Sequence, residues 1–181
     1  MIITISGKAG SGKSTVAKML AAKLGLKHYS IGDLMRERSQ EKGISIIDIN
    51  KLAETDKSID KELDSKQIML GKTQNNFVID GRLTAYFIPN ADLKIFLDAE
   101  DNVRAQRILK DRRKLEGNTN IKKAMSNIEK RELSEKKRYK EYYGVDYHNR
   151  KLYDYIIDTT NLSPQEVVDK VVEIVKKIKY F

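Results

Sequence analysis

The chain has 181 residues, a length typical of one domain, and we expect residues 1–181 to fold as a single unit. It has no cysteine, which excludes disulfides and thiolate metal sites, and its two histidines argue against a histidine-ligated metal centre. No apolar stretch approaches the ~18 residues of a membrane helix, and residues 2–5 are too short for the core of a signal peptide. We therefore expect a cytoplasmic protein with no membrane partner.

The net charge of +9 comes from one segment. Residues 104–140 contain 14 Lys or Arg and 5 Asp or Glu, whereas the rest of the chain contains 21 of each kind. We expect this segment to face an anion, either nucleotide phosphates or a nucleic acid.

Strands and helices are predicted to alternate along the chain. Short apolar runs predict strands at residues 2–5, 77–80, 93–97 and 155–157, with a further short strand at 28–30. Helical patterns are found at residues 14–24, over most of 31–71, at 98–113, at 121–143 and from residue 164 onward. This alternation is typical of an α/β fold with a mostly parallel sheet.

A glycine-rich loop lies between the first predicted strand and the first helix. It matches the pattern G-x-x-x-x-G-K-[ST] in the context that this pattern requires. Backbone amides of such a loop surround a phosphate, its lysine reaches the β- and γ-phosphates, and its hydroxyl can ligate Mg²⁺. The loop therefore predicts a nucleoside triphosphate and Mg²⁺ as ligands. The predicted nucleotide-binding residues are Gly7, Lys8, Ala9, Gly10, Ser11, Gly12, Lys13, Ser14 and Thr15, with Ser14 on the metal.

Length and motifs narrow the class of phosphate-loop protein. The chain is too short for a motor domain with accessory parts, and it lacks the N-K-x-D sequence with which GTPases read guanine. Small kinases need one addition that holds the acceptor and another that excludes water, because an open site would hydrolyse the triphosphate. We expect the acceptor-binding insertion at about residues 31–73 and the lid at about 111–140, around a core of residues 1–30, 74–110 and 141–181.

Several stretches resemble the cytidylate kinases, and together they span the chain. The run VIDGR (residues 78–82) and the following PNADLKIFLDA (89–99) are similar to the family's strand ending in D-G-R and its P-x-A-D-L-K-I-F-L-x-A. The runs SIGDLMR (30–36), RELSEKKR (131–138) and IDTTNLS (157–163) resemble three further family motifs. The YGVD at residues 143–146 and the short insertion look like the compact archaeal branch.

This resemblance implies a fold and a reaction. The fold is the P-loop kinase fold, a five-stranded parallel sheet in the order 2-3-1-4-5 with helices on both faces, a small acceptor-binding insertion and a helical lid. The reaction is transfer of the γ-phosphoryl group of ATP to CMP, and also to dCMP, which gives ADP and CDP. We expect Mg²⁺ as cofactor, ATP and CMP or dCMP as partners, no nucleic acid, and a monomer.

The resemblance also assigns roles to individual side chains. Arg82 and Arg36 would hold the phosphate of CMP, because a guanidinium can bind two phosphate oxygens at once. Asp80 would orient Arg82 or a Mg²⁺-bound water. The implied acceptor-binding residues are Ser30, Gly32, Asp33, Arg36, Asp80, Gly81, Arg82, Arg131, Glu135 and Arg138.

Arg131, Glu135 and Arg138 share one face of a predicted helix, because they are separated by about one and two helical turns. The resemblance implies that this face presents two cations to phosphates and one carboxylate to a ribose hydroxyl. Without it, such a charged run would be interpreted as a solvated helix surface. The implied catalytic residues are Lys13, Arg82, Arg131 and Arg138.

Two positions depart from the family pattern. Leu83 occupies the position where bacterial members carry an acidic residue that helps to read cytosine, so the base must be read by Asp33, Asp60 or Gln67. Glu135 replaces the family's aspartate, which makes the expected ribose contact longer.

Other polar patterns receive structural interpretations. Asp56, Asp60 and Asp64 recur every four residues, which predicts a solvated helix face rather than a metal site. The tyrosines between residues 139 and 155 are expected to pack the lid helix onto the core rather than to stack on RNA. One or two of Arg104, Arg107, Arg112 and Arg113 would belong to the lid or to the adenine side, and the others to the surface.

Two alternatives remain open. The chain could be a kinase for another small acceptor such as AMP, UMP or shikimate, which would share the fold and differ in the groups that read the acceptor. It could also be a non-catalytic, nucleotide-gated RNA-binding factor that uses the basic segment on a phosphodiester backbone.

Overall fold

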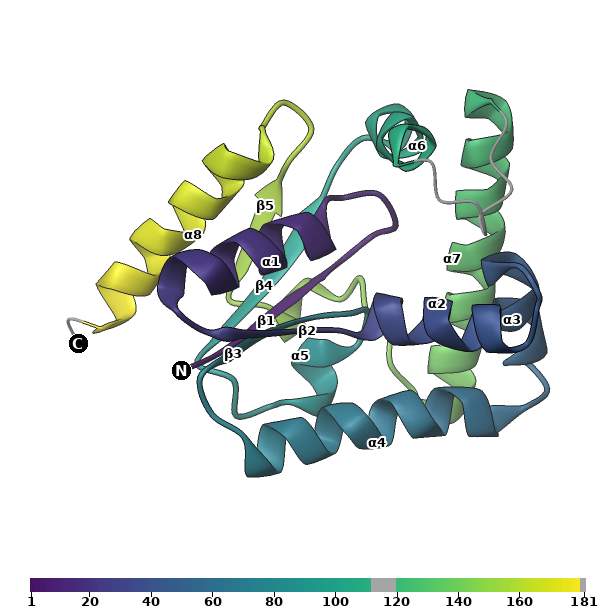
Figure 1. Cartoon of the computed structure of the whole chain (residues 1–181), viewed down its shortest axis with the longest axis horizontal. Helices are drawn as coiled ribbons and strands as arrows, with labels where there is room; N and C mark the ends of the chain where they lie inside the picture. The colour runs from purple at the N-terminus through teal and green to yellow at the C-terminus, as the bar shows by residue number, and fades with distance from the viewer. Residues whose placement is uncertain (112–119, 180–181) are drawn as a thin grey trace.

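The computed structural model describes residues 1–111 and 120–179, which form one parallel sheet with helices on both faces (Figure 1). The strands are β1 (Ile2–Gly7), β2 (Lys27–Ser30), β3 (Phe77–Asp80), β4 (Leu93–Asp98) and β5 (Tyr155–Asp158). Their order is β2-β3-β1-β4-β5, and every neighbouring pair is parallel. The predicted sheet and its strand order are therefore confirmed.

The helices follow the predicted alternation. They are α1 (Lys13–Leu24), α2 (Ile31–Glu41), α3 (Ile46–Leu52), α4 (Lys57–Thr73), α5 (Thr84–Phe87), α6 (Asp101–Lys110), α7 (Ile121–Tyr143) and α8 (Pro164–Lys179), with a short 3-10 turn, η2 (Arg150–Leu152). None of the helices in the described ranges is both long and apolar enough to cross a membrane.

One face of the sheet is covered by α1 and α8, which lie side by side in Figure 1. Alternate residues of β1 point to this face, so Ile3 and Ile5 are fully buried beneath the two helices. The apolar stripe of α8, which includes Val168 and Val171, completes this part of the core with Leu20 of α1. Each such buried side chain contributes about 1.5–3 kcal/mol of stabilisation.

The predicted helical region of residues 31–71 consists of three helices. Gly43, with φ of 64°, follows α2 in a left-handed conformation, and Ser45 then caps α3 by accepting a hydrogen bond from the backbone amide of Asp48. Asp56 caps α4 by accepting a hydrogen bond from the amide of Ser58. These two breaks fold the region into three helices that lie on the same side of the molecule as α7 (Figure 1).

Arg138 of α7 joins that helix to α3 and α4. Its side chain is 1% exposed, and its Nε donates to the Asp60 carboxylate at 2.7 Å. Its Nη atoms donate to the backbone oxygen and the side-chain oxygen of Asn50 and to the hydroxyl of Ser134. All four residues of this contact are buried. The contact therefore anchors α7 against α3 and α4, which belong to the predicted acceptor-binding insertion.

The predicted solvated face of α4 is therefore wrong. Asp60 is 3% exposed and paired with Arg138, and Asp64 is half-buried and accepts a hydrogen bond from the Tyr143 hydroxyl of α7. Asp56, at the helix start, is only partly exposed and caps the helix. The acidic face of α4 packs against the basic helix α7. The local spacing of the aspartates does not predict this packing.

The burial of this ion pair generates a stability prediction. Arg138→Met should lower the free energy of unfolding by about 3–5 kcal/mol, because it leaves the Asp60 carboxylate buried without its counter-charge. Urea denaturation at pH 8 measures the change.

The control is Arg38→Met, which removes a partly exposed arginine that pairs with Glu41 and Glu62 and should change stability by less than about 1 kcal/mol. An Arg138→Met variant as stable as wild type would contradict the anchoring role.

Candidate active site

The glycine-rich loop joins β1 to α1 at the carboxyl end of the sheet. Gly7, with φ of 145°, has no room for a Cβ atom, which would lie 2.1 Å from the backbone oxygen of Leu97. A Cβ at Gly10 would lie 2.5 Å from the backbone oxygen of Arg104. The loop is therefore fixed between β4 and α6, with its amides at the start of α1, the geometry that binds phosphate.

A cavity of about 410 Å³ opens from this loop. One group of its lining residues comes from the loop itself, α6 and the segment that follows β5, including Arg107, Thr159 and Leu162. A second group comes from α2, α3, α4, the end of β3 and α7, including Met35, Leu63 and Tyr139. The cavity thus extends from the loop to the region that the sequence assigned to the acceptor.

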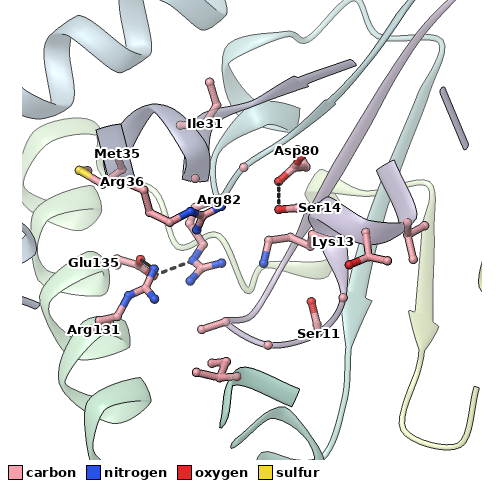
Figure 2. Close-up of a pocket in the computed structure, with 18 of the residues that line it drawn as sticks. Ser11, Lys13, Ser14, Ile31, Met35, Arg36, Asp80, Arg82, Arg131 and Glu135 are labelled. Atoms are coloured by element: carbon pink, nitrogen blue, oxygen red, sulfur yellow. Dashed lines mark hydrogen bonds and ion pairs between the residues drawn. The ribbon is translucent and has the colours of Figure 1, made fainter. Parts of the chain in front are cut away.

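Figure 2 shows four cationic side chains directed toward the same space in this cavity: those of Lys13, Arg36, Arg82 and Arg131. They come from α1, α2, the turn after β3 and α7. Glu135 lies among them, and Asp80 lines the cavity next to Ser14. Such a concentration of cations is suited to binding several phosphate groups.

Arg82 occupies the centre of this cluster. Its Nη1 donates to the backbone oxygen of Gly7 at 2.9 Å, and its Nε donates to Glu135 at 2.7 Å. Arg131 lies 4.0 Å from the other oxygen of Glu135. Burial by itself would raise the pKa of Glu135, but the charges of Arg82 and Arg131 outweigh it and lower that pKa, so Glu135 is ionised.

Lys13 lies beside this pair and donates to the backbone oxygen of Lys8 at 2.7 Å. Burial, and then the charge of Arg82, lower the pKa of Lys13 well below its ordinary value. The carboxylates of Asp80 and Glu135 offset this only in part. An anion placed between Lys13 and Arg82 would remove this mutual repulsion, which is a physical reason for the site to bind phosphate.

Ser14 and Asp80 form an oxygen pair next to the loop. The Ser14 hydroxyl donates to Asp80 Oδ2 at 2.7 Å, as the dashed line in Figure 2 marks. The other oxygen, Oδ1, lies 2.8 Å from Nε2 of His28 on β2. A hydroxyl and a carboxylate are the hard oxygen donors that Mg²⁺ prefers, and Mg²⁺ needs only one or two such protein ligands when phosphates and water complete its shell. The donor set fits this ion.

Most of the predicted site residues lie together. Those that line the cavity are Ala9, Gly10, Ser11, Gly12, Lys13, Ser14, Thr15, Gly32, Arg36, Asp80, Gly81, Arg82, Arg131 and Glu135. Gly7 and Lys8 support the loop from outside the cavity, where Lys8 pairs with Asp98 at 3.1 Å. Ser30 caps α2, and Asp33 in its first turn pairs with Arg36.

Arg138 is not brought to the cavity. It was expected to bind phosphate with Arg131, but it is buried in its contact with Asp60. Glu135 likewise holds Arg82 rather than presenting a free carboxylate to a ribose. In both residues the charged group is already engaged by a neighbour from another segment of the chain.

The basic residues of α6 also have defined partners. Arg104 is buried and donates to the backbone oxygen of Ala9 and to Glu132, so it supports the loop. Arg107 lines the cavity and donates to the backbone oxygen of Thr159 at 2.6 Å, and its place on the adenine side stays a prediction. Arg112, Arg113 and part of the predicted lid lie outside the described residues. The predicted packing role of the tyrosines is confirmed for Tyr139 and Tyr147, which are buried.

Asp60, Leu63, Asp64 and Gln67 lie on one face of α4 and all line the cavity. Asp60 and Gln67 were named from the sequence as candidate readers of the base, whereas Leu63 and Asp64 were not predicted as site residues. The spacing of three and four residues within this group was the available signal, because it places all four on one helix face. Asn50 of α3 and Tyr139 of α7 had no comparable signal.

Known proteins resemble the chain over most of its length. The family model described as the cytidylate kinase-like family matches residues 2–161. The chain is 42% identical to the cytidylate kinase of Pyrococcus horikoshii, over 92% of this chain and 84% of that protein. It is 40% identical to the cytidylate kinase of Archaeoglobus fulgidus, over 99% of this chain and 98% of that protein.

Solved structures confirm the P-loop kinase fold. The shikimate kinase of Bacteroides thetaiotaomicron superimposes with a TM-score of 0.65 at 16% identity, over 97% of this chain and 98% of that chain. The shikimate kinase of Acinetobacter baumannii in complex with shikimate gives a TM-score of 0.59 at 16% identity, over 97% and 93%. At this identity the likeness concerns the fold alone.

The buried acidic face of α4 gives a pH-dependent prediction. Burial raises the pKa of Asp64 from 3.8 to about 7, helped by the nearby charge of Asp60 and opposed by the Tyr143 hydrogen bond. Between these two pH values the folded protein keeps a proton that the unfolded chain has released. Wild-type stability should therefore fall relative to Asp64→Asn as the pH rises from 4 to 7, and the difference should be constant above pH 8.

Urea denaturation of both proteins between pH 4.5 and 8.5 measures this difference, and titrating groups that do not interact with Asp64 cancel between them. A difference that does not change with pH would show that Asp64 titrates normally.

Proposed function

Because this chain belongs to the cytidylate kinase-like family, we propose that it transfers the γ-phosphoryl group of ATP to CMP, giving ADP and CDP. The observation that carries this proposal is that the phosphate loop, with Lys13 and Ser14, and a second group of cations, Arg36, Arg82 and Arg131, line one cavity. We infer that each group binds phosphate.

The arrangement supports transfer between two nucleotides. ATP would place its phosphates on the amides of the loop and its adenine toward Arg107 and Thr159. The monophosphate of the acceptor would be held by Arg36 and Arg82. A cation between the two phosphates lowers their repulsion and stabilises charge in the transition state, as arginines do in phosphoryl transfer.

Mg²⁺ would be held by Ser14 and by Asp80, directly or through water, and it supplies charge neutralisation on the phosphates when bound. The acceptor oxygen belongs to a phosphate and is already anionic, so no side chain needs to act as a general base. The contribution of this chain is to position both nucleotides and to exclude water.

We extend the proposal to dCMP. Glu135, the side chain expected at the ribose, has its carboxylate engaged by Arg82 and Arg131. A site that does not depend on the 2′-hydroxyl accepts both sugars. That the chain acts as a cytoplasmic monomer stays a prediction.

Two observations disfavour the alternatives. The relatives at about 40% identity are cytidylate kinases, whereas the shikimate kinases share only the fold at 16% identity. Two arginines of the basic segment, Arg104 and Arg138, are buried against carboxylates and cannot contact RNA, which leaves the exposed lysines of α7 as the cations that such a role would use. Part of the positive charge of this segment is therefore neutralised by carboxylates inside the protein.

The proposal predicts a substrate preference. ADP release should be measured with ATP and Mg²⁺ against CMP, dCMP, UMP, AMP, GMP and shikimate, each at the same concentration. CMP and dCMP should be the best acceptors by at least about tenfold, since one good hydrogen bond to a base is worth a factor of this size. The Lys13→Ala variant should be inactive with every acceptor.

Preference for AMP, UMP or shikimate would contradict the base assignment. Inactivity with all six, together with RNA binding that weakens steeply with salt, would favour the non-catalytic alternative.

A further inference from the structure

Gln67 on α4 has an unpaired oxygen at the acceptor side of the cavity. Its side chain is 2% exposed and lines the cavity, and its Nε2 donates to Asp64 Oδ1 at 3.2 Å. Its Oε1 is buried and has no hydrogen-bond partner among the described residues. A buried carbonyl without a partner is unfavourable, and a ligand that donates a hydrogen bond would complete it.

The orientation of this amide is fixed by its neighbours. Asp64 accepts one hydrogen bond from the Gln67 amide and another from the hydroxyl of Tyr143 on α7. The Tyr143 ring packs edge-on against Phe87, with ring centroids 5.2 Å apart. At pH 8, above the raised pKa of Asp64, its carboxylate is ionised and can only accept hydrogen bonds, so the NH₂ group of Gln67 faces Asp64 and the Gln67 oxygen remains available.

The other polar groups nearby are already engaged. Asn50 donates to the backbone oxygen of Ile46 and accepts from Arg138, and Asp60 accepts from Arg138. Asp33 pairs with Arg36. Within the described part of the chain, the buried cavity-lining oxygens that lack a partner are those of Gln67 and Ser11, and Ser11 belongs to the phosphate loop.

The surroundings suit a flat, apolar ring. Met35, Leu63, Leu83 and Tyr139 line the same part of the cavity. Leu83, which occupies the position of the bacterial acidic residue, is 3% exposed and packs with Tyr139 and Tyr147. Hydrogen-bonding recognition must therefore come from α4 rather than from the turn after β3.

We propose that the carbonyl oxygen of Gln67 accepts a hydrogen bond from the 4-amino group of cytosine, and that Asp64 holds the amide in the orientation that makes this possible. This inference rests on the proposed function. Cytosine presents an amino donor at this position, whereas uracil presents an oxygen acceptor, which would face the Gln67 oxygen without a proton between them. A site built to bind such a donor rejects the analogue that lacks it.

The test is the Gln67→Met variant, which keeps the size of the side chain and removes its hydrogen bonds. The kcat/KM should be measured at pH 8 with CMP, UMP and the pyrimidin-2-one ribonucleotide, which carries hydrogen at the position of the amino group. We expect a loss of about 10- to 100-fold with CMP, a change of less than about threefold with the pyrimidin-2-one nucleotide, and a much smaller preference for CMP over UMP.

Asp64→Asn tests the positioning role. The amide that this substitution introduces can donate as well as accept hydrogen bonds, so the Gln67 amide can rotate and exchange its oxygen and nitrogen. The CMP to UMP ratio of kcat/KM should therefore fall, while the kcat with UMP should not. The matched control is Gln40→Met, the same substitution at an exposed position of α2, which should keep the wild-type ratio.

The outcomes separate the two proposals. A wild-type protein that does not phosphorylate CMP would overturn the proposed function. A wild-type protein that prefers CMP, with a Gln67→Met variant of unchanged preference or with an equal loss for all three nucleotides, would overturn the role of Gln67 alone. If Gln67→Met does not fold, the ratio measured with Asp64→Asn decides.

Discussion

The guanidinium of Arg82 connects the two halves of the site, and the rest of the arrangement depends on it. It donates to the phosphate-loop backbone at Gly7 and to the carboxylate of Glu135 on α7. The parallel register of β1 and β3 aligns Ile5 with Asp80, so the turn that carries Arg82 emerges next to the loop. A buried cation of this kind needs a counter-charge, and α7 supplies it.

Because it supplies this carboxylate, α7 is more than a cover for the cavity. It contributes Glu135 to the phosphate side, Arg138 to the contact with α3 and α4, and Tyr143 to the acidic face of α4. The basic segment that gave the chain its net charge therefore has two uses. Arg131 faces the cavity, whereas Arg138 and Arg104 are buried and hold helices and loop in place.

The sequence was sufficient to predict the sheet, the phosphate loop and most of the cavity lining, because these follow from local patterns and from the motifs around Asp80, Gly81 and Arg82. It was not sufficient to predict the contacts of Arg138, which shares a helix face with Arg131. Two helical turns move a side chain about 10 Å along the axis, enough to take it from the cavity to the junction with α3 and α4. It was also insufficient for Asp60, whose partner is 78 residues away in the chain. Helix periodicity shows which residues share a face but not which element covers it.

The central claim is that Glu135 acts through Arg82, and a double-mutant cycle tests it most directly. The kcat/KM with CMP should be measured for wild type, Arg82→Met, Glu135→Gln and the double variant. If Glu135 serves to hold Arg82, Glu135→Gln will reduce kcat/KM strongly in wild type and by less than about threefold once Arg82 is gone. An equally large reduction in both backgrounds would show that Glu135 acts on the substrate itself, and would contradict the account.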